Sequence, residues 1–340
     1  MLQRMFQAAT VFMVTILLVG CTQSGDALLD DYRKRMENVL LGKVPDRGTL
    51  ALPGYPRARD VRIEVEDIRL DVLDAWALRR CELFALISER NSILGRVAQP
   101  DVRLDYEQRL LLAIPECLTQ DIELPEALQE ELTRVLALKL SQLPLRIWNA
   151  TLAHPDVQSY WNGGNSTFRQ EDEVDYEGYR DAQNRLAYLA VHPELAQPGD
   201  WVSALEPIAQ YPMGGHSLHS MRAAILSLEQ TESLLREATE SRRLCPQGNP
   251  RRELNFARNV MVQTFVGEVQ PWLVRVDQRF LAGYEPLQAI HDQLGIENPS
   301  MAAYLSELDA LHQRFRQQIR SQVEAWQALF EGCGRAAVER

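Results

Sequence analysis

Long apolar stripes at helical spacing constrain the fold of this chain more than any other feature of its sequence. The longest stripe consists of Leu305, Leu308, Leu311, Phe315, Ile319, Val323, Trp326 and Phe330. Spacings of three and four residues over this length predict a long amphipathic helix that packs antiparallel to its neighbours. A second stripe runs from Leu254 to Phe280 and contains Pro271, which we expect to kink or split its helix.

Most of the remaining chain also has helical periodicity, with Gly and Pro residues as the expected stop signals. Asp26 is the expected N-cap of the first helix. Val61, Ile63 and Val65 alternate with charged residues and form the best strand candidate, but a lone strand cannot form a sheet. The sequence therefore predicts an all-α, multi-helix bundle with little or no sheet. Its shorter helices are expected near residues 26–41, 71–94, 104–114, 125–143, 178–191, 201–209 and 218–235.

Length and charge restrict the domain organisation and the class of partner. The 340 residues allow one large domain or two smaller ones. Prolines, glycines and a cluster of acids gather between residues 154 and 177, where we expect an exposed loop or a boundary between two lobes. The net charge of −11 repels phosphate backbones, so a nucleic-acid partner is not expected. Gly-rich phosphate-binding motifs are absent from the sequence, and we predict no cofactor.

Residues 1–20 have the pattern of a secretory signal peptide. The apolar run from Ala8 to Val19 is shorter than the ~20 residues of a membrane-spanning helix. It ends in Leu18-Val19-Gly20-Cys21, which resembles the lipobox of bacterial lipoproteins. That resemblance implies cleavage before Cys21 and acylation of its thiol and new amine; the alternative is an ordinary signal peptide followed by a chance cysteine. Two or more acyl chains hold a protein stably on a membrane, so the membrane itself becomes a partner through the lipid on Cys21.

This interpretation divides the chain and suggests its location. Residues 21–60 would hold the lipidated N-terminus, the first helix and a Pro/Gly-rich loop. Residues 61–333 would form the helical domain, and residues 334–340 a tail. Thr22 follows the cysteine where retained inner-membrane lipoproteins have Asp, so by analogy we expect the periplasmic face of the outer membrane rather than the inner membrane.

Four cysteines remain once Cys21 is set aside. An even number in an oxidising compartment predicts two disulfides, with three possible pairings. We expect Cys81–Cys117 and Cys245–Cys333, because each pair can lie close together when neighbouring helices run antiparallel. Four buried thiols or a metal site are the alternatives. Since neither a C-x-x-C motif nor a Cys/His cluster is present, zinc and thiol redox chemistry are not expected.

Two polar motifs are candidate sites. Glu89, Arg90, Asn91 and Ser92 follow an apolar helical segment, and they could form a small site with a base, an anion-binding guanidinium and two donors. The alternative, which we favour, is a buried Glu–Arg network that fixes the helix end and the turn at Gly95.

The second motif is the H-x-x-H pair of His216 and His219, which could supply two metal ligands from one helix face. No acid lies between the two histidines, and a third ligand would have to come from elsewhere. We therefore predict no metal site here.

Several segments resemble a known family. The match is most specific around Glu89-Arg90-Asn91-Ser92, within residues 81–97. The other similar pieces are residues 103–107, Ile147-Trp148-Asn149, Val269-Gln270-Pro271-Trp272 and residues 326–334. Together they resemble a proteobacterial lipoprotein family known as domain of unknown function 3080, over nearly all of the mature chain. The resemblance implies a lipoprotein, and it implies no activity, cofactor or catalytic residue.

The function expected from these observations is that of a lipid-anchored envelope protein. We expect a non-enzymatic module that binds or scaffolds another envelope protein at the periplasmic face, and we assign no catalytic residue. The alternative is a periplasmic enzyme or small-ligand binder that uses the polar residues around Glu89, Arg90 and Asn91.

Overall fold

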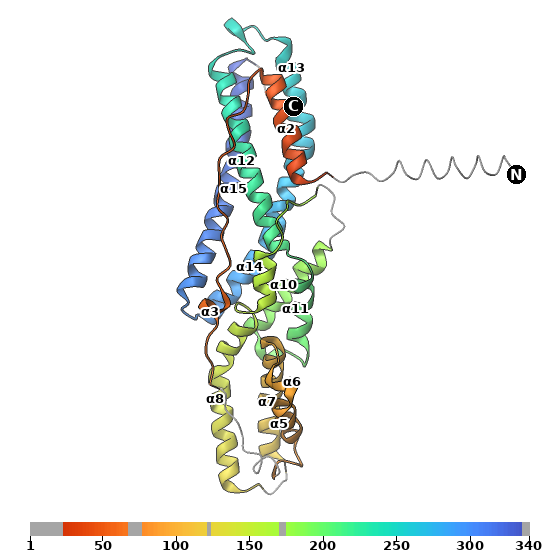
Figure 1. Cartoon of the computed structure of the whole chain (residues 1–340), viewed down its shortest axis with the longest axis vertical. Coiled ribbons are helices and arrows are strands. Elements are labelled where there is room, and N and C mark those ends of the chain that lie inside the picture. The colour runs from red at the N-terminus through yellow and green to blue at the C-terminus, as the bar shows by residue number, and fades with distance from the viewer. Residues whose placement is uncertain (1–22, 67–76, 121–123, 170–174, 335–340) are drawn as a thin grey trace, which may run out of the picture.

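A computed structural model describes residues 23–66, 77–120, 124–169 and 175–334. The regular structure in these ranges is helical, which confirms the all-α prediction. The β-type pairing found among the described residues is an isolated bridge between Ser24 and Arg169. The helices form an elongated body, with the long helices at one end and a smaller group of helices at the other (Figure 1).

The helices are divided between the N-terminal and the C-terminal half of the chain. The first half contains α2 (Gly25–Leu40), α3 (Ala58–Val61), α5 (Leu83–Asn91), α6 (Ile93–Arg96), α7 (Pro100–Thr119), α8 (Glu126–Ala150) and α9 (Pro155–Asn162). The second half contains α10 (Tyr176–Val191), η1 (Pro193–Leu195), α11 (Asp200–Gln210), α12 (Met213–Glu240), η2 (Pro246–Gly248), α13 (Arg252–Asn259), η3 (Val260–Val269), α14 (Gln270–Leu294) and α15 (Pro299–Gly332).

The predicted long stripes lie on real helices. α15 packs along α12, and α2 packs against α12, α13 and η3. Pro271 does not split its helix, because Val269 and Gln270 both keep right-handed helical angles and the chain continues from η3 into α14. The segment before the proline has wider, π-type turns instead. A proline lacks the N–H that a regular turn would use, so irregular hydrogen bonding next to it is expected.

Prolines misled the prediction of helix ends. Pro100 does not stop a helix but begins α7, where its missing N–H costs nothing. Pro115 and Pro144 lie inside α7 and α8, so the ends predicted at 114 and 143 were wrong. Both helices continue because their later turns carry buried side chains, among them Trp148 of α8, whose packing outweighs the local cost of proline.

The strand candidate is not a strand. Val61 ends α3, and the following residues run in extended form beside α8. The side chain of Asn149 makes the two hydrogen bonds that a neighbouring strand would make with Ile63. Its Oδ1 accepts from the Ile63 N–H at 2.9 Å, and its Nδ2 donates to the Ile63 carbonyl at 2.7 Å. The first N-cap also differs from the prediction, because Ser24 rather than Asp26 caps α2.

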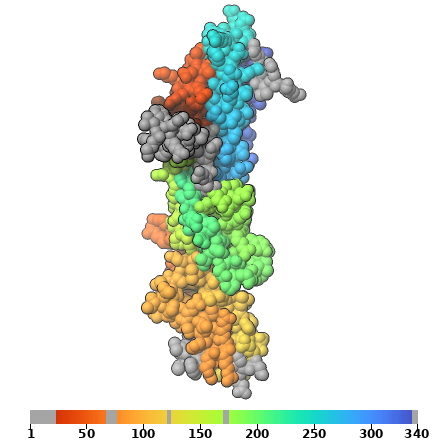
Figure 2. All heavy atoms as spheres, turned by 90° about the vertical axis from the view of Figure 1, so that its right-hand side faces the viewer, coloured from red at the N-terminus to blue at the C-terminus, as the bar shows by residue number. Residues whose placement is uncertain are grey.

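The buried apolar residues form two clusters. The larger spans α2, α9–α15 and the C-terminal part of α8, and the smaller joins α5, α7 and the N-terminal part of α8 at the lower end of Figures 1 and 2. Val157, Tyr160 and Leu186 all belong to the larger cluster, so the core divides along α7 and α8 rather than across residues 154–177. A boundary of domains near 154–177 stays a prediction.

Each cluster has its own disulfide, in the predicted pairing. Cys81–Cys117 joins the segment before α5 to α7, with Cα atoms 5.5 Å apart. Cys245–Cys333 joins the segment after α12 to the end of α15, with Cα atoms 5.6 Å apart. No helix within the described ranges is long and apolar enough to cross a membrane. Cys21 lies outside the described residues.

Candidate functional site

The predicted polar block does not form a buried network. Glu89 is exposed at the end of α5, and its Oε1 accepts a hydrogen bond from Arg109 Nη2 of α7 at 2.5 Å. Arg90 Nη1 donates to the carbonyl of Gly95 at 2.9 Å. The expected burial was wrong, because Glu89 is exposed and pairs with Arg109 rather than with Arg90. The expected role at the Gly95 turn is confirmed, since Arg90 donates to the Gly95 carbonyl.

The other two residues of the block build the turn into α6. Ser92 Oγ accepts from the Gly95 N–H at 3.0 Å and is the N-cap of α6. Arg96 donates to the Asn91 carbonyl through Nε and Nη2. Asn91 and Ser92 are both exposed. The block is thus a capped turn at the surface, in which Glu89, Asn91 and Ser92 are exposed.

The two histidines of the H-x-x-H motif both belong to α12, but they contact different residues. His216 stacks on Tyr211, with ring centroids 5.0 Å apart, and its Nδ1 lies 2.8 Å from the Ser166 carbonyl. His219 Nδ1 lies 2.9 Å from Arg222 Nη2. Across the parts of the chain that the structure describes, no group of three His, Cys, Asp or Glu side chains is arranged to hold a metal ion.

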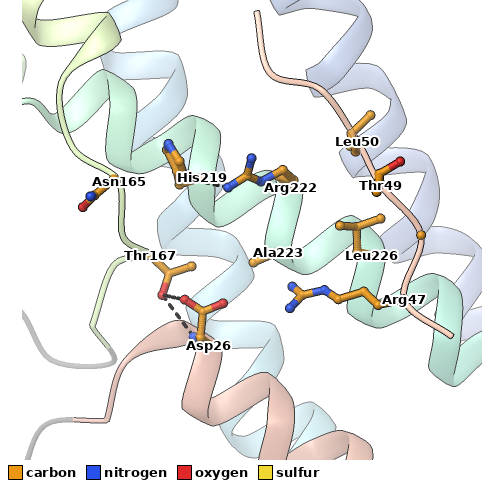
Figure 3. A pocket seen from close by; sticks show the side chains of 11 residues that line it. Asp26, Arg47, Thr49, Leu50, Asn165, Thr167, His219, Arg222, Ala223 and Leu226 are labelled. Carbon is orange, nitrogen blue, oxygen red and sulfur yellow. Dashed lines mark hydrogen bonds between the residues drawn. The ribbon is translucent and has the colours of Figure 1, made fainter.

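A polar hollow beside His219 is a better candidate site (Figure 3). It has a volume of about 320 Å³ and lies between α2, α12, the extended segment after α2 and the loop before residue 170. Its lining is Asp26, Arg47, Gly48, Thr49, Leu50, Asn165, Thr167, His219, Arg222, Ala223 and Leu226. Figure 3 shows the side chains of Arg47 and Asp26 pointing toward one another across the hollow.

Arg47 reaches the hollow from an extended segment, and the residues just before it are hydrogen-bonded to α12 and to α2. Gln230 Nε2 of α12 donates to the Pro45 carbonyl at 2.6 Å. The Val44 N–H donates to Glu37 Oε1 of α2 at 3.1 Å. Arg47 itself is exposed and makes no hydrogen bond or ion pair with the described residues. Its position is set by the backbone, while its guanidinium remains available.

Asp26 is held by a reciprocal pair of hydrogen bonds. Its N–H donates to Thr167 Oγ1 at 3.0 Å, and Thr167 Oγ1 donates to Asp26 Oδ2 at 3.0 Å. Position 26 lies in the first turn of α2, where the helix dipole stabilises a carboxylate. These contacts engage one carboxylate oxygen and leave the other toward the hollow (Figure 3).

His219 and Arg222 form the α12 wall. A guanidinium is only a donor, so Nδ1 of His219 must accept the hydrogen bond from Arg222 and carry no proton. Burial, followed by the nearby charge of Arg222, lowers the pKa of His219 below its usual value. The imidazole is therefore neutral near pH 7, and Arg222 keeps its charge and its remaining N–H donors.

A second hollow of about 360 Å³ adjoins the first and shares Asp26 and Arg47 with it. It follows α2 toward Glu37 and Lys43, under the same extended segment. Sequence reasoning missed Arg47 and Arg222 as site residues. They lie 175 positions apart, and no motif marks them; only the packing of α2 and the extended segment on α12 brings them together.

Comparison with known proteins places this architecture in a family. The family model described as "Protein of unknown function (DUF3080)" matches residues 29–337. The chain belongs to the DUF3080 family. The DUF3080 match contains both disulfides and both arginines of the hollow, and it begins just after Asp26. No curated protein and no solved structure matches the chain.

Proposed function

We propose that this DUF3080 chain is a lipid-anchored, extracytoplasmic binding protein that scaffolds a partner protein of the cell envelope. Two disulfides support an oxidising compartment outside the cytoplasm. The lipobox-like Leu18-Val19-Gly20-Cys21 supports acylation of Cys21, and Thr22 favours the periplasmic face of the outer membrane. The membrane and an envelope protein are then its two partners.

The pair of guanidinium groups at the hollow carries the binding part of the proposal. Within the described ranges, Arg47 has no partner, and the hydrogen bond of Arg222 goes to a neutral imidazole. Two such groups favour a carboxylate or another anionic group, since charge-assisted hydrogen bonds are the strong ones. We therefore infer that an acidic segment of the partner binds here, with Asp26 accepting a hydrogen bond from a partner N–H.

The arrangement favours binding over catalysis. His219 uses its free nitrogen to accept from Arg222, and Asp26 is bonded to Thr167, so neither group is poised as a base beside a nucleophile. The alternative site at Glu89 is an exposed ion pair on a capped turn. A binding role is therefore the better interpretation of these residues.

Photo-crosslinking from the hollow tests the binding proposal. A photoreactive amino acid replaces Thr49, which lines the hollow, in the full acylated chain in cells. The double substitution Arg47→Gln and Arg222→Gln should reduce adducts roughly tenfold, because two charged hydrogen bonds are lost. Arg236→Gln is the matched control, since Arg236 is exposed on the same helix and pairs only with Glu232. Adducts that persist at full yield in the double variant would exclude the hollow as the binding site.

Acyl labelling tests the anchor separately. Cys21→Ser should remain uncleaved by the lipoprotein-specific signal peptidase and should take up no labelled palmitate. Labelling that persists in Cys21→Ser would show that the lipid is elsewhere or that the signal is of another type.

A further inference from the structure

The turn between α5 and α6 presents the most exposed apolar side chains among the described residues. Ile93 is 80% exposed, Leu94 79% and Val97 72%. The other large aliphatic residues that are exposed in the described part of the chain are less accessible, at 65% or below. Three neighbouring aliphatic side chains held in water are costly, so this turn is a candidate contact surface for an apolar partner.

The turn is built to keep its shape and to satisfy its backbone. Arg90 donates to the Gly95 carbonyl, Arg96 donates to the Asn91 carbonyl, and Ser92 caps the Gly95 N–H. A Cβ at Gly95 would fall on the carbonyl oxygen of Glu89, so the close turn requires glycine. Carbonyl groups that already have partners can enter an apolar medium at low cost, whereas free ones cannot.

The segment between Cys21 and the start of α2 is short, and its length limits which side of the body can face a membrane. Three residues separate Cys21 from Gly25, the first residue of α2, and the four Cα–Cα steps between them reach at most about 14 Å. α2 itself has 16 residues and rises about 24 Å toward one end of the body. If the body stood upright with the C-terminal end of α2 against the membrane, a lipid on Cys21 could not reach that membrane. The opposite end lies farther from Gly25 (Figure 1).

The start of α2 and the α5–α6 turn lie on the same side of the body. Both are on the right-hand side in Figure 1, α2 in the upper part and α6 in the lower part. In Figure 2, where that side faces the viewer, the orange helices of the smaller cluster are in front. A body tethered at Cys21 and lying along the membrane thus brings α6, which carries the exposed Ile93 and Leu94 and is followed by the exposed Val97, to the bilayer side.

We propose that the α5–α6 turn inserts Ile93, Leu94 and Val97 into the surface of the bilayer to which the chain is anchored. This inference rests on the proposed lipid at Cys21. The turn gives the elongated body a second membrane contact, so that it lies flat. The polar residues Glu89 to Ser92 then build a membrane-docking turn, with Glu89 fixing α5 to Arg109.

Site-directed fluorescence with an artificial tether tests this geometry without depending on native acylation. In the chain from residue 22 onward, an N-terminal hexahistidine replaces the lipid and holds the protein on vesicles of phosphatidylethanolamine and phosphatidylglycerol with a nickel-chelating lipid. An environment-sensitive dye is attached at Leu94→Cys. We expect its emission to shift to the blue on the vesicles and to be quenched by nitroxide-labelled lipids.

Two variants make the result specific. The same dye at Leu140→Cys is the matched control, because Leu140 is 52% exposed and belongs to α8, the helix on the left of the lower end in Figure 1. This dye should show neither shift nor quenching. Adding Ile93→Asp and Val97→Asp to the Leu94→Cys chain should abolish both effects while the melting temperature stays unchanged. If the emission of the dye at position 94 neither shifts nor is quenched on the vesicles, the proposal is overturned. Crosslinks from position 94 to a protein in cells would then identify the turn as a protein interface. Palmitate labelling that persists in the Cys21→Ser variant of the separate anchor test would instead count against Cys21 acylation.

Discussion

Asp101 and His154 form a buried hydrogen-bonded pair between α7 and the start of α9. His154 Nδ1 accepts from the Asp156 N–H at 3.2 Å, so its Nε2 carries the hydrogen and faces Asp101 Oδ1 at 3.3 Å. Burial raises the pKa of the Asp101 carboxyl, but the hydrogen bond from His154 and the backbone N–H of Val102 outweigh it and lower the pKa below its usual value. The ionised carboxyl therefore stabilises the fold.

Asp101→Asn should lower the free energy of unfolding by about 1–3 kcal/mol at pH 7. The folded pKa of Asp101 is depressed, so its contribution is present above the unfolded pKa of about 4 and is lost as the pH falls through the folded pKa. Urea unfolding across the acid range should show the wild type and the variant converging below about pH 4. The control Asp181→Asn, at a carboxyl that is 70% exposed, should change stability little. A constant difference at every pH would contradict the role assigned to ionisation.

Gly215 is a second residue whose identity the packing dictates. A Cβ at this position, in the first turn of α12, would fall on the carbonyl oxygen of Gly163, which belongs to backbone and cannot move aside. Gly215→Ala should destabilise the chain by about 1–3 kcal/mol or more. Gly54→Ala is the control, because a Cβ there meets nothing within 4 Å. Equal melting temperatures for the two variants would show that the α9–α12 contact is looser than described.

At the level of elements, the sequence predicts the helices well and their ends poorly. Periodicity identifies the long amphipathic helices because each has one continuous buried face. Pro115 and Pro144 misled the prediction since their local cost is offset by contacts with residues distant in the sequence. The extended residues near Ile63 alternate like a strand, but their hydrogen-bond partner is the Asn149 side chain, which no local pattern reveals.

The candidate site also depends on contacts between residues distant in the sequence, which local patterns do not reveal. The block at Glu89 stands out in the sequence because four polar residues are adjacent, yet it forms an exposed turn. Arg47 and Arg222 do not stand out, since arginine is common throughout the chain and each lies in an ordinary context. Their shared hollow depends on the register of the extended segment against α12, which is a tertiary property.

Asn298 is an element-scale contact that joins two helices. Its Oδ1 accepts from the Met301 N–H at 2.9 Å and caps α15, while its Nδ2 donates to the Asp60 carbonyl of α3 at 3.1 Å. Asn298→Ala loses both contacts and should cost about 2 kcal/mol. Asn298→Asp keeps the cap and loses only the donor, so its cost should be about half as large. Chemical denaturation of the three proteins measures this order, and an equal cost for both variants would show that the cap contributes nothing.

At the scale of the whole molecule, a layer of buried charge separates the two apolar clusters. Lys139 Nζ of α8 lies 2.7 Å from Glu107 Oε2 of α7, and Arg146 Nη2 lies 3.6 Å from Glu107 Oε1. The three side chains are at most 8% exposed. They occupy the stretch of α7 and α8 where the buried neighbours change from one cluster to the other. Charged groups bury less apolar surface than aliphatic ones, so the two clusters are coupled mainly through the helices that cross this layer.

The two disulfides should therefore stabilise different parts of the molecule. Removing Cys81–Cys117 with a double Ala substitution should cost up to about 4 kcal/mol by chain entropy, and the loss should fall on the small cluster. Hydrogen exchange should then accelerate in α5 and in the C-terminal part of α7, while α12 and α15 keep their protection. Double Ala substitution at Cys245 and Cys333 should instead accelerate exchange at the ends of α12 and α15, which that disulfide ties together. If both variants lost protection uniformly along the chain, the clusters would unfold as one unit, and the charged layer would not divide the molecule.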